Sequence, residues 1–169
     1  MLRLTLVRHA KAEPARAGQE DWDRALDPQG QKEAVEIGLR LHQRALKPNS
    51  LVSSSALRAI STASLLAREL GFPSKSIFTD ERLYLVSASA LLEWIREGDW
   101  AARHPTQHLM IVAHNPGLSE FAAHIAVSPI VDSLGTSAAY TLQFEIEHWC
   151  DLRWSSGINA ELESPQRRD

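Results

Sequence analysis

The chain has 169 residues, the length of one ordinary domain, and its 18 basic and 21 acidic side chains give a formal net charge of −3 at pH 7. This mild acidity argues against nucleic acid as a partner, because binding to a phosphate backbone needs a clear excess of lysine and arginine. The only cysteine, Cys150, excludes an intrachain disulfide framework and a thiolate zinc cluster, and it is compatible with a reducing compartment. No run reaches the roughly 18–20 apolar residues that a membrane span requires, so we expect a cytoplasmic protein without membrane contact.

Short apolar runs and amphipathic segments alternate along the chain, which predicts strands alternating with helices. In chain order we expect a strand at 2–7, a helix from Gln29 to a stop at 47–49, a strand at 51–53, a helix at 56–70, a weak strand at 76–78, a helix at 88–97, a buried strand at 109–113, a helix at 117–126 and a hairpin of two strands at 138–146 and 149–154. This order is typical of a single α/β domain with three α/β/α layers and a mostly parallel sheet. We assign the domain to residues 1–154 and expect residues 155–169 to form a flexible C-terminal tail.

Three of the expected strands end in residues that can bind an anion. Arg8 and His9 follow the first strand, Arg58 lies in the first turn of the helix after the second, and His114 follows the buried strand at 109–113. The carboxyl ends of parallel strands meet at one edge of a sheet, where ligands bind in such folds. Guanidinium groups match phosphate oxygens, and a neutral imidazole is a competent nucleophile near pH 7. Together these residues favour a site in which His9 attacks phosphorus.

Each of these residues also has an ordinary structural interpretation. An isolated Arg8–His9 pair, a solvated Arg58 or a hydrogen-bonded His114 would carry no chemistry, and only their joint placement favours a site. The five remaining histidines show no metal-ligand spacing and are interpreted as structural or exposed: His42, His104, His108, His124 and His148.

Four segments, spread over roughly residues 2–120, resemble the sequence boxes of the histidine phosphatase superfamily, also called phosphoglycerate-mutase-like. They are LVRHAKA at 6–12, with Ala10 in place of the glycine of the RHG box, DRALDPQG at 23–30, SSSALRAISTA at 53–63 and VAHNP at 112–116. The RHAKA form of the first box and the HNP form of the last are most similar to the SixA-type phosphohistidine phosphatases. The resemblance implies a phosphoglycerate-mutase-like fold and no metal or organic cofactor.

The resemblance also implies a role for each matching residue. His9 would be the nucleophile that becomes phosphorylated, and its neighbour Arg8 would bind the phosphoryl oxygens. Arg58 and His114 would bind them from the other two strand ends. The backbone N–H of Asn115 would add a further donor to the substrate.

Two more basic residues close to these boxes are candidates for substrate binding. Lys11 would add positive charge at the rim of the site or remain solvated. Arg24 would border the mouth of the site or pair with Asp21 or Asp23.

One position departs from the family's pattern. Many members carry a glutamate general acid shortly after a segment such as DERL, whereas the segment DERLYLVS at 80–87 places Leu85 there and leaves Glu81 as the nearest carboxylate. Residues 85–107 are too few for a large cap, so we expect an open site. Both features favour phosphohistidine on a phosphorylated protein as the substrate.

Two alternatives remain. One is a phosphomonoesterase for a small metabolite, with Glu81 or water as the acid. The other is a non-catalytic phosphate-binding module, against which the presence of both histidines and both arginines argues.

Overall fold

A computed structural model describes residues 1–101 and 105–166, and a six-stranded sheet forms its centre. In the order of the sheet, the strands are β3 (Phe78–Asp80), β2 (Ser50–Ser54), β4 (His108–Ala113), β1 (Leu2–Arg8), β5 (Ala139–Phe144) and β6 (Ile158–Glu163). The first four are parallel, and β5 and β6 run antiparallel to them. The expected mostly parallel sheet is therefore confirmed.

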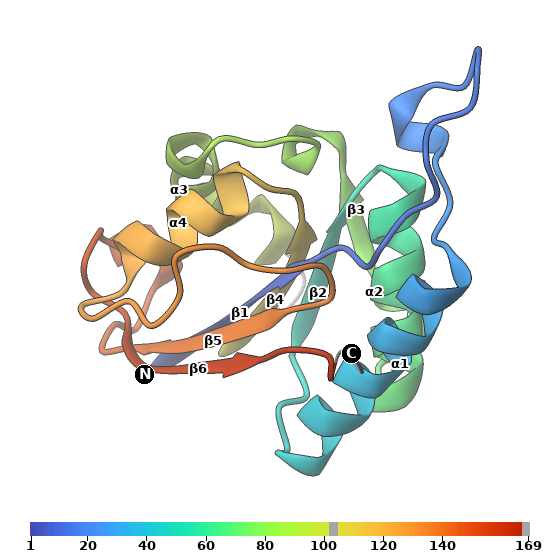
Figure 1. The fold of residues 1–169 in the computed structure, drawn as a ribbon. Coiled ribbons are helices and arrows are strands. Elements are labelled where there is room, and N and C mark those ends of the chain that lie inside the picture. The colour runs from blue at the N-terminus through green and yellow to red at the C-terminus, as the bar shows by residue number, and fades with distance from the viewer. Residues whose placement is uncertain (102–104, 167–169) are drawn as a thin grey trace.

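Helices cover both faces of this sheet (Figure 1). Helices α1 (Pro28–Gln43) and α2 (Leu57–Leu70) lie on one face, and α3 (Ala88–Glu97) and α4 (Gly117–Ile125) lie on the other. The central strand β4 shows why, because its buried side chains alternate between two cores. Leu109 and Ile111 pack in the α3–α4 core, whereas Met110 and Val112 pack in the α1–α2 core. This arrangement is the expected three-layer α/β/α domain.

Short polar residues and glycines mark the helix ends, as the sequence indicates. The side chain of Asp27 caps α1 by accepting a 2.7 Å hydrogen bond from the backbone of Gly30, and Ser87 caps α3 in the same way. Helix α2 ends at Gly71, which adopts a φ of 61° that favours glycine.

No helix in the described part of the chain is both long and apolar enough to cross a membrane.

The C-terminal part differs from the expectation. The segment 149–154 is not a strand: Trp149–Asp151 is a short 3-10 helix whose Trp149 is buried in the α3–α4 core. The last strand, β6, lies instead within the segment expected to be a flexible tail, and it pairs antiparallel with β5. Its residues, INAELE, alternate between apolar and polar, but none of them is fully buried, because β6 is an edge strand.

Two contacts outside the sheet fix this edge strand. Arg44, which follows α1, forms ion pairs with Glu161 at 2.6 Å and with Glu163. The expectation of an unanchored tail is therefore wrong for β6. Residues 167–169 of that tail, and His104, lie outside the described residues.

The segment that leads from β3 to the site differs from the expectation in one respect. The weak strand expected at 76–78 begins two residues later, as β3, because Ser74–Ser76 forms a 3-10 turn. A second 3-10 turn, Glu81–Leu83, follows β3 and leads to Tyr84. The chain thus reaches Tyr84 on the side of the sheet edge where the parallel strands end.

We predict that Gly117→Ala destabilises the fold, because a Cβ atom at Gly117 would lie 1.9 Å from the carbonyl oxygen of Val86. Relieving this backbone overlap should lower the free energy of unfolding by about 1–3 kcal/mol in urea denaturation. It should also weaken orthophosphate binding, because the displaced loop carries Tyr84. The control Gly18→Ala meets no heavy atom within 4 Å, so only its positive φ of 74° is strained. Unchanged stability and phosphate binding in Gly117→Ala would contradict this close approach.

Candidate active site

The site lies where three neighbouring parallel strands end. His9 follows β1, Ser54 is the last residue of β2, and His114 follows β4, which lies between them. The imidazole rings of His9 and His114 are 5.1 Å apart between centroids. Arg58, in the first turn of α2, contacts both rings. The structure therefore brings together the residues that the sequence placed at three separate strand ends.

The hydrogen bonds of His9 define which of its nitrogens can react. Nδ1 donates to the carbonyl oxygen of Ala10 at 2.7 Å, and Nε2 accepts from Nε of Arg58 at 3.3 Å. Burial lowers the pKa of His9 to about 4, assisted by the nearby arginines and opposed by the bond to Ala10. His9 is thus neutral at pH 7, with its unprotonated Nε2 beside a guanidinium group.

His114 is buried and takes part in a second chain of hydrogen bonds. Its Nδ1 accepts from Nη2 of Arg58 at 3.4 Å, so Nε2 carries the proton and donates to Oγ of Ser54 at 2.7 Å. Burial lowers the pKa of His114 to about 3, with further lowering by His9 and Arg58. His114 therefore enters the site as a neutral ring fixed at both nitrogens.

Asp21 completes the set of partners around Arg58. Nη1 of Arg58 donates to the backbone carbonyl of Asp21 at 2.8 Å, and Nη2 donates to its Oδ2 at 2.9 Å. The same carboxylate accepts from the hydroxyl of Tyr84 and from Nη1 of Arg24 at 3.0 Å. The Tyr84 hydroxyl, then Arg24 and Arg58, hold the pKa of Asp21 well below its usual range.

Tyr84 was not identified from the sequence, and Asp21 was considered only as a partner for Arg24. The Tyr84 ring stands edge-on to His114, with centroids 5.4 Å apart, and its centroid lies 6.0 Å from the Arg58 guanidinium carbon. Neither residue belongs to a periodic apolar pattern. The available signal was an acidic residue two positions before the DRALDPQG box and a tyrosine directly after DERL.

The two basic residues considered as candidates for substrate binding, Arg24 and Lys11, bind neighbouring protein groups. Arg24 pairs with Asp21 and donates from Nε to the carbonyl of Glu13 at 2.9 Å, which is the pairing that the sequence left open. Lys11 is exposed, and its Nζ lies 3.5 Å from Asp27 and 3.3 Å from Gln29. These contacts direct Lys11 toward the start of α1.

Arg8 and Asn115 both bind one loop before β5. Nη1 of Arg8 and Nδ2 of Asn115 donate to the carbonyl of Leu134 at 3.0 and 2.9 Å. Ser119 connects the same groups, since its Oγ donates to Oδ1 of Asn115 and accepts from the backbone of Leu134. The Asn115 side chain therefore fixes the loop, and the role of its backbone N–H stays a prediction.

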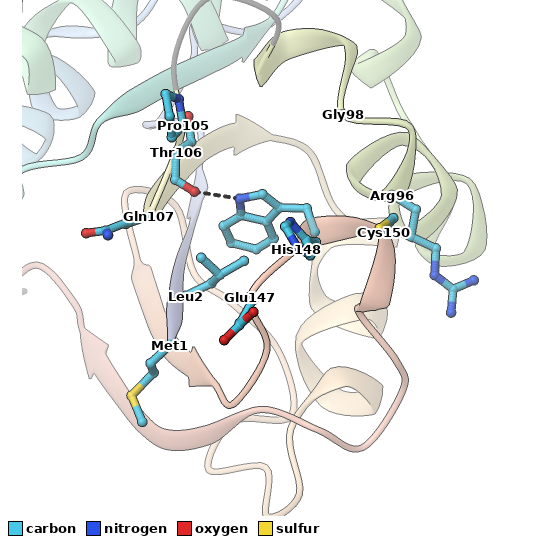
Figure 2. A pocket seen from close by; sticks show the side chains of 11 residues that line it. Met1, Leu2, Arg96, Gly98, Pro105, Thr106, Gln107, Glu147, His148 and Cys150 are labelled. Carbon is cyan, nitrogen blue, oxygen red and sulfur yellow. Dashed lines mark hydrogen bonds between the residues drawn. The ribbon is translucent and has the colours of Figure 1, made fainter.

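A separate cavity of about 570 Å³ lies at the opposite ends of the parallel strands (Figure 2). Leu2 and Gln107, which line it, belong to the start of β1 and to the residue before β4. The dashed line in Figure 2 marks the hydrogen bond from the Trp149 indole to the carbonyl of Thr106, at 2.8 Å. None of the site residues lines this cavity. Among residues 1–101 and 105–166, no three or more His, Cys, Asp or Glu side chains form a group that could hold a metal ion.

Comparison with known proteins agrees with this geometry. Residues 4–85 match the family model of the histidine phosphatase superfamily, branch 1. An uncharacterized protein from Picosynechococcus sp. strain PCC 7002 is 34% identical over 126 residues, which cover 74% of this chain and 73% of the relative. The chain belongs to the histidine phosphatase superfamily, and it is a phosphatase.

The similar solved structures support a more specific description of the fold. SixA from Agrobacterium tumefaciens superposes with a TM-score of 0.75 at 26% identity, over 97% of this chain and 98% of that one. A mycobacterial glucosyl-3-phosphoglycerate phosphatase superposes with a TM-score of 0.66 at 21% identity, over 97% and 98% of the two chains. The resemblance to the SixA type is therefore confirmed, and the phosphoglycerate-mutase-like fold with it.

We predict that acid destabilises the protein through the two site histidines and through His108, whose pKa burial also lowers to about 4. Both site histidines have a folded pKa, about 4 for His9 and about 3 for His114, below the usual 6.5. Between pH 6.5 and 4 the unfolded chain binds more protons, so the free energy of unfolding should fall as pH falls through this window. His9→Gln should flatten this dependence in urea titrations at several pH values, whereas His42→Gln, on the exposed end of α1, should not. An equal slope in His9→Gln and wild type would contradict a neutral, partly buried His9.

Proposed function

We propose that the protein is a phosphohistidine phosphatase that removes the phosphoryl group from a phosphorylated protein through a covalent intermediate on His9. The observation that carries this proposal is the hydrogen-bond pattern of His9. Nδ1 donates to Ala10, so the lone pair of Nε2 is available, and Arg58 lies beside it. A nucleophile needs this protonation state to attack phosphorus.

In the first step, Nε2 of His9 forms a bond to phosphorus while the bond from phosphorus to the substrate's imidazole breaks. Arg8 and Arg58 stabilise the charge on the phosphoryl oxygens, and the neutral His114 ring, held by Arg58 and Ser54, lines the same site. In the second step, water attacks phosphorus and the bond to Nε2 of His9 breaks. The electron pair returns to Nε2, and the protons of water pass to the released phosphate and solvent.

The leaving group supports a P–N bond rather than a P–O bond as the substrate. An alkoxide needs a proton as it departs, and a placed acid contributes about 10²–10⁴-fold to that step. Leu85, at the acid position of the family, is apolar and 54% exposed. A phosphorylated imidazole can be protonated on its other nitrogen, whose free pKa is about 6.5, and then leaves as a neutral ring without an acid from the enzyme.

A protein-bound substrate is favoured by the exposed surroundings of the site. Trp22, the residue after Asp21, is 50% exposed. Leu85, the residue after Tyr84, is also exposed. Such an open rim admits a phosphoryl group that is attached to a second protein. We place this reaction in the cytoplasm, in keeping with the free thiol of Cys150.

We predict that the protein hydrolyses a phosphohistidine peptide with a kcat/KM at least about 10²-fold higher than a phosphoserine peptide or a small sugar phosphate, because those esters need an acid. Leu85→Glu should raise ester hydrolysis relative to phosphohistidine hydrolysis. The comparison uses released phosphate at matched substrate concentrations. If wild type hydrolyses the esters with the same kcat/KM as the phosphohistidine peptide, the small-metabolite phosphomonoesterase is favoured, with Glu81 as the first acid to test.

We predict that His9→Ala abolishes turnover and the covalent intermediate while the fold persists, because one partly exposed imidazole at a strand end is removed. Rapid acid-free quenching of wild type with labelled substrate should trap a phosphoenzyme that is acid-labile and alkali-stable, as P–N bonds are. The control His42→Ala removes an exposed histidine of α1 and should retain both signals. Turnover in His9→Ala at the wild-type rate would exclude His9 as the nucleophile.

A further inference from the structure

A second cavity of about 520 Å³ adjoins the phosphate-binding residues and is not explained by them. Five residues line it: Trp22, Ser55, Glu81, Arg82 and Tyr84. We call it the Trp22–Tyr84 groove.

Tyr84 joins this groove to the site. Its ring contacts His114, and its hydroxyl donates to Asp21, the carboxylate that holds Arg58. Ser55 connects the two regions a second time, since it follows directly on Ser54, the partner of His114. A group bonded to a phosphoryl between the two histidines therefore lies next to the groove.

The walls of the groove are aromatic. Trp22 and Tyr84 meet edge to face with centroids 6.3 Å apart, and Tyr84 meets His114 in the same manner at 5.4 Å. Trp22 is 50% exposed although it is the largest apolar side chain of its loop. An exposed indole beside a cavity offers a planar face to which a second planar or cationic group can bind.

The charge of the groove favours a cation. Arg82 is neutralised by Asp80 and Glu97, each at 2.8 Å. Glu81 is exposed, and the described part of the chain offers it no ion pair or side-chain hydrogen bond. The groove thus presents one uncompensated carboxylate and two aromatic faces.

We propose that the Trp22–Tyr84 groove binds the leaving imidazole of the phosphohistidine substrate in its protonated, cationic form. This proposal rests on the proposed function and names how that substrate is recognised. The ring lies against Trp22 and Tyr84, and Glu81 stabilises the proton on the nitrogen that is not bonded to phosphorus. When the P–N bond breaks, its electron pair stays on the ring nitrogen, so that the cationic ring departs as neutral imidazole.

Binding is tested apart from turnover in a His9→Ala background, where the phosphohistidine peptide persists. The dissociation constant of this peptide is measured by calorimetry and compared with that of orthophosphate. Adding Trp22→Ala should weaken peptide binding about tenfold, which matches a stacking or cation–π contact of about 1.4 kcal/mol, and should leave orthophosphate binding unchanged. Adding Glu81→Gln should weaken peptide binding in the same selective way.

Two controls keep the result specific. Glu145→Gln changes an exposed carboxylate after β5, at the opposite end of the sheet, and should have no effect. A phosphoserine peptide of the same sequence carries no ring and should bind equally well with and without Trp22.

Each outcome decides one of the two proposals. Equal peptide affinities with and without Trp22 and Glu81 overturn the groove as the imidazole site, even if wild type hydrolyses phosphohistidine. Selective weakening supports the groove. Failure of wild type to hydrolyse the phosphohistidine peptide overturns the proposed function, while the binding comparison in the His9→Ala background still decides what the groove recognises.

Discussion

The guanidinium of Arg58 is buried at the centre of the site, with only 3% of the residue exposed. The positions of the surrounding groups depend on it, because its N–H donors require hydrogen-bond acceptors. A buried cation is tolerated only where polar partners surround it. Those partners come from three parts of the chain: the loop at Asp21, the end of β1 at His9 and the end of β4 at His114. Because the donors of a guanidinium point in fixed directions, these segments must meet it at defined positions.

The same cation explains the protonation states of its neighbours. Burial is the largest cause of the lowered pKa values of His9 and His114, and the charge of Arg58 lowers both further. The positive charge of the site therefore resides on its arginines, whereas the imidazoles of His9 and His114 are neutral at pH 7. Asp21 offsets part of that charge and keeps Arg58 oriented before a substrate arrives.

The sequence was informative wherever a short motif coincided with a strand end. His9, Arg58 and His114 could be placed together because the carboxyl ends of parallel strands share one edge of the sheet. Tyr84 and the bonds from Asp21 to Arg58 were not predicted, because both residues belong to or follow short 3-10 turns, in which no apolar periodicity indicates where a side chain points. The bonds of Lys11 to Asp27 and Gln29 depend on how closely α1 approaches the first loop, which no local pattern reports.

The last strand was misplaced for a related reason. Trp149 and Leu152 are apolar and buried, so the segment 149–154 resembles a strand, yet they reach the core from a 3-10 turn and irregular backbone. The residues of β6 alternate between apolar and polar over only six positions, and none is fully buried because β6 is an edge strand. Its position is fixed by pairing with β5 and by Arg44, both of which are distant in sequence.

The position of β1 in the sheet has a consequence for the order in which the protein is made. The strand β1, which His9 follows, is synthesised well before its two neighbours, β4 and β5, whose first residues are His108 and Ala139. Such long-range pairing slows folding, because a long stretch of chain must be closed before the contacts form. A chain that is complete only up to α2 therefore contains Arg58 but leaves β1 unpaired and lacks His114, so the site is assembled only when the sheet closes.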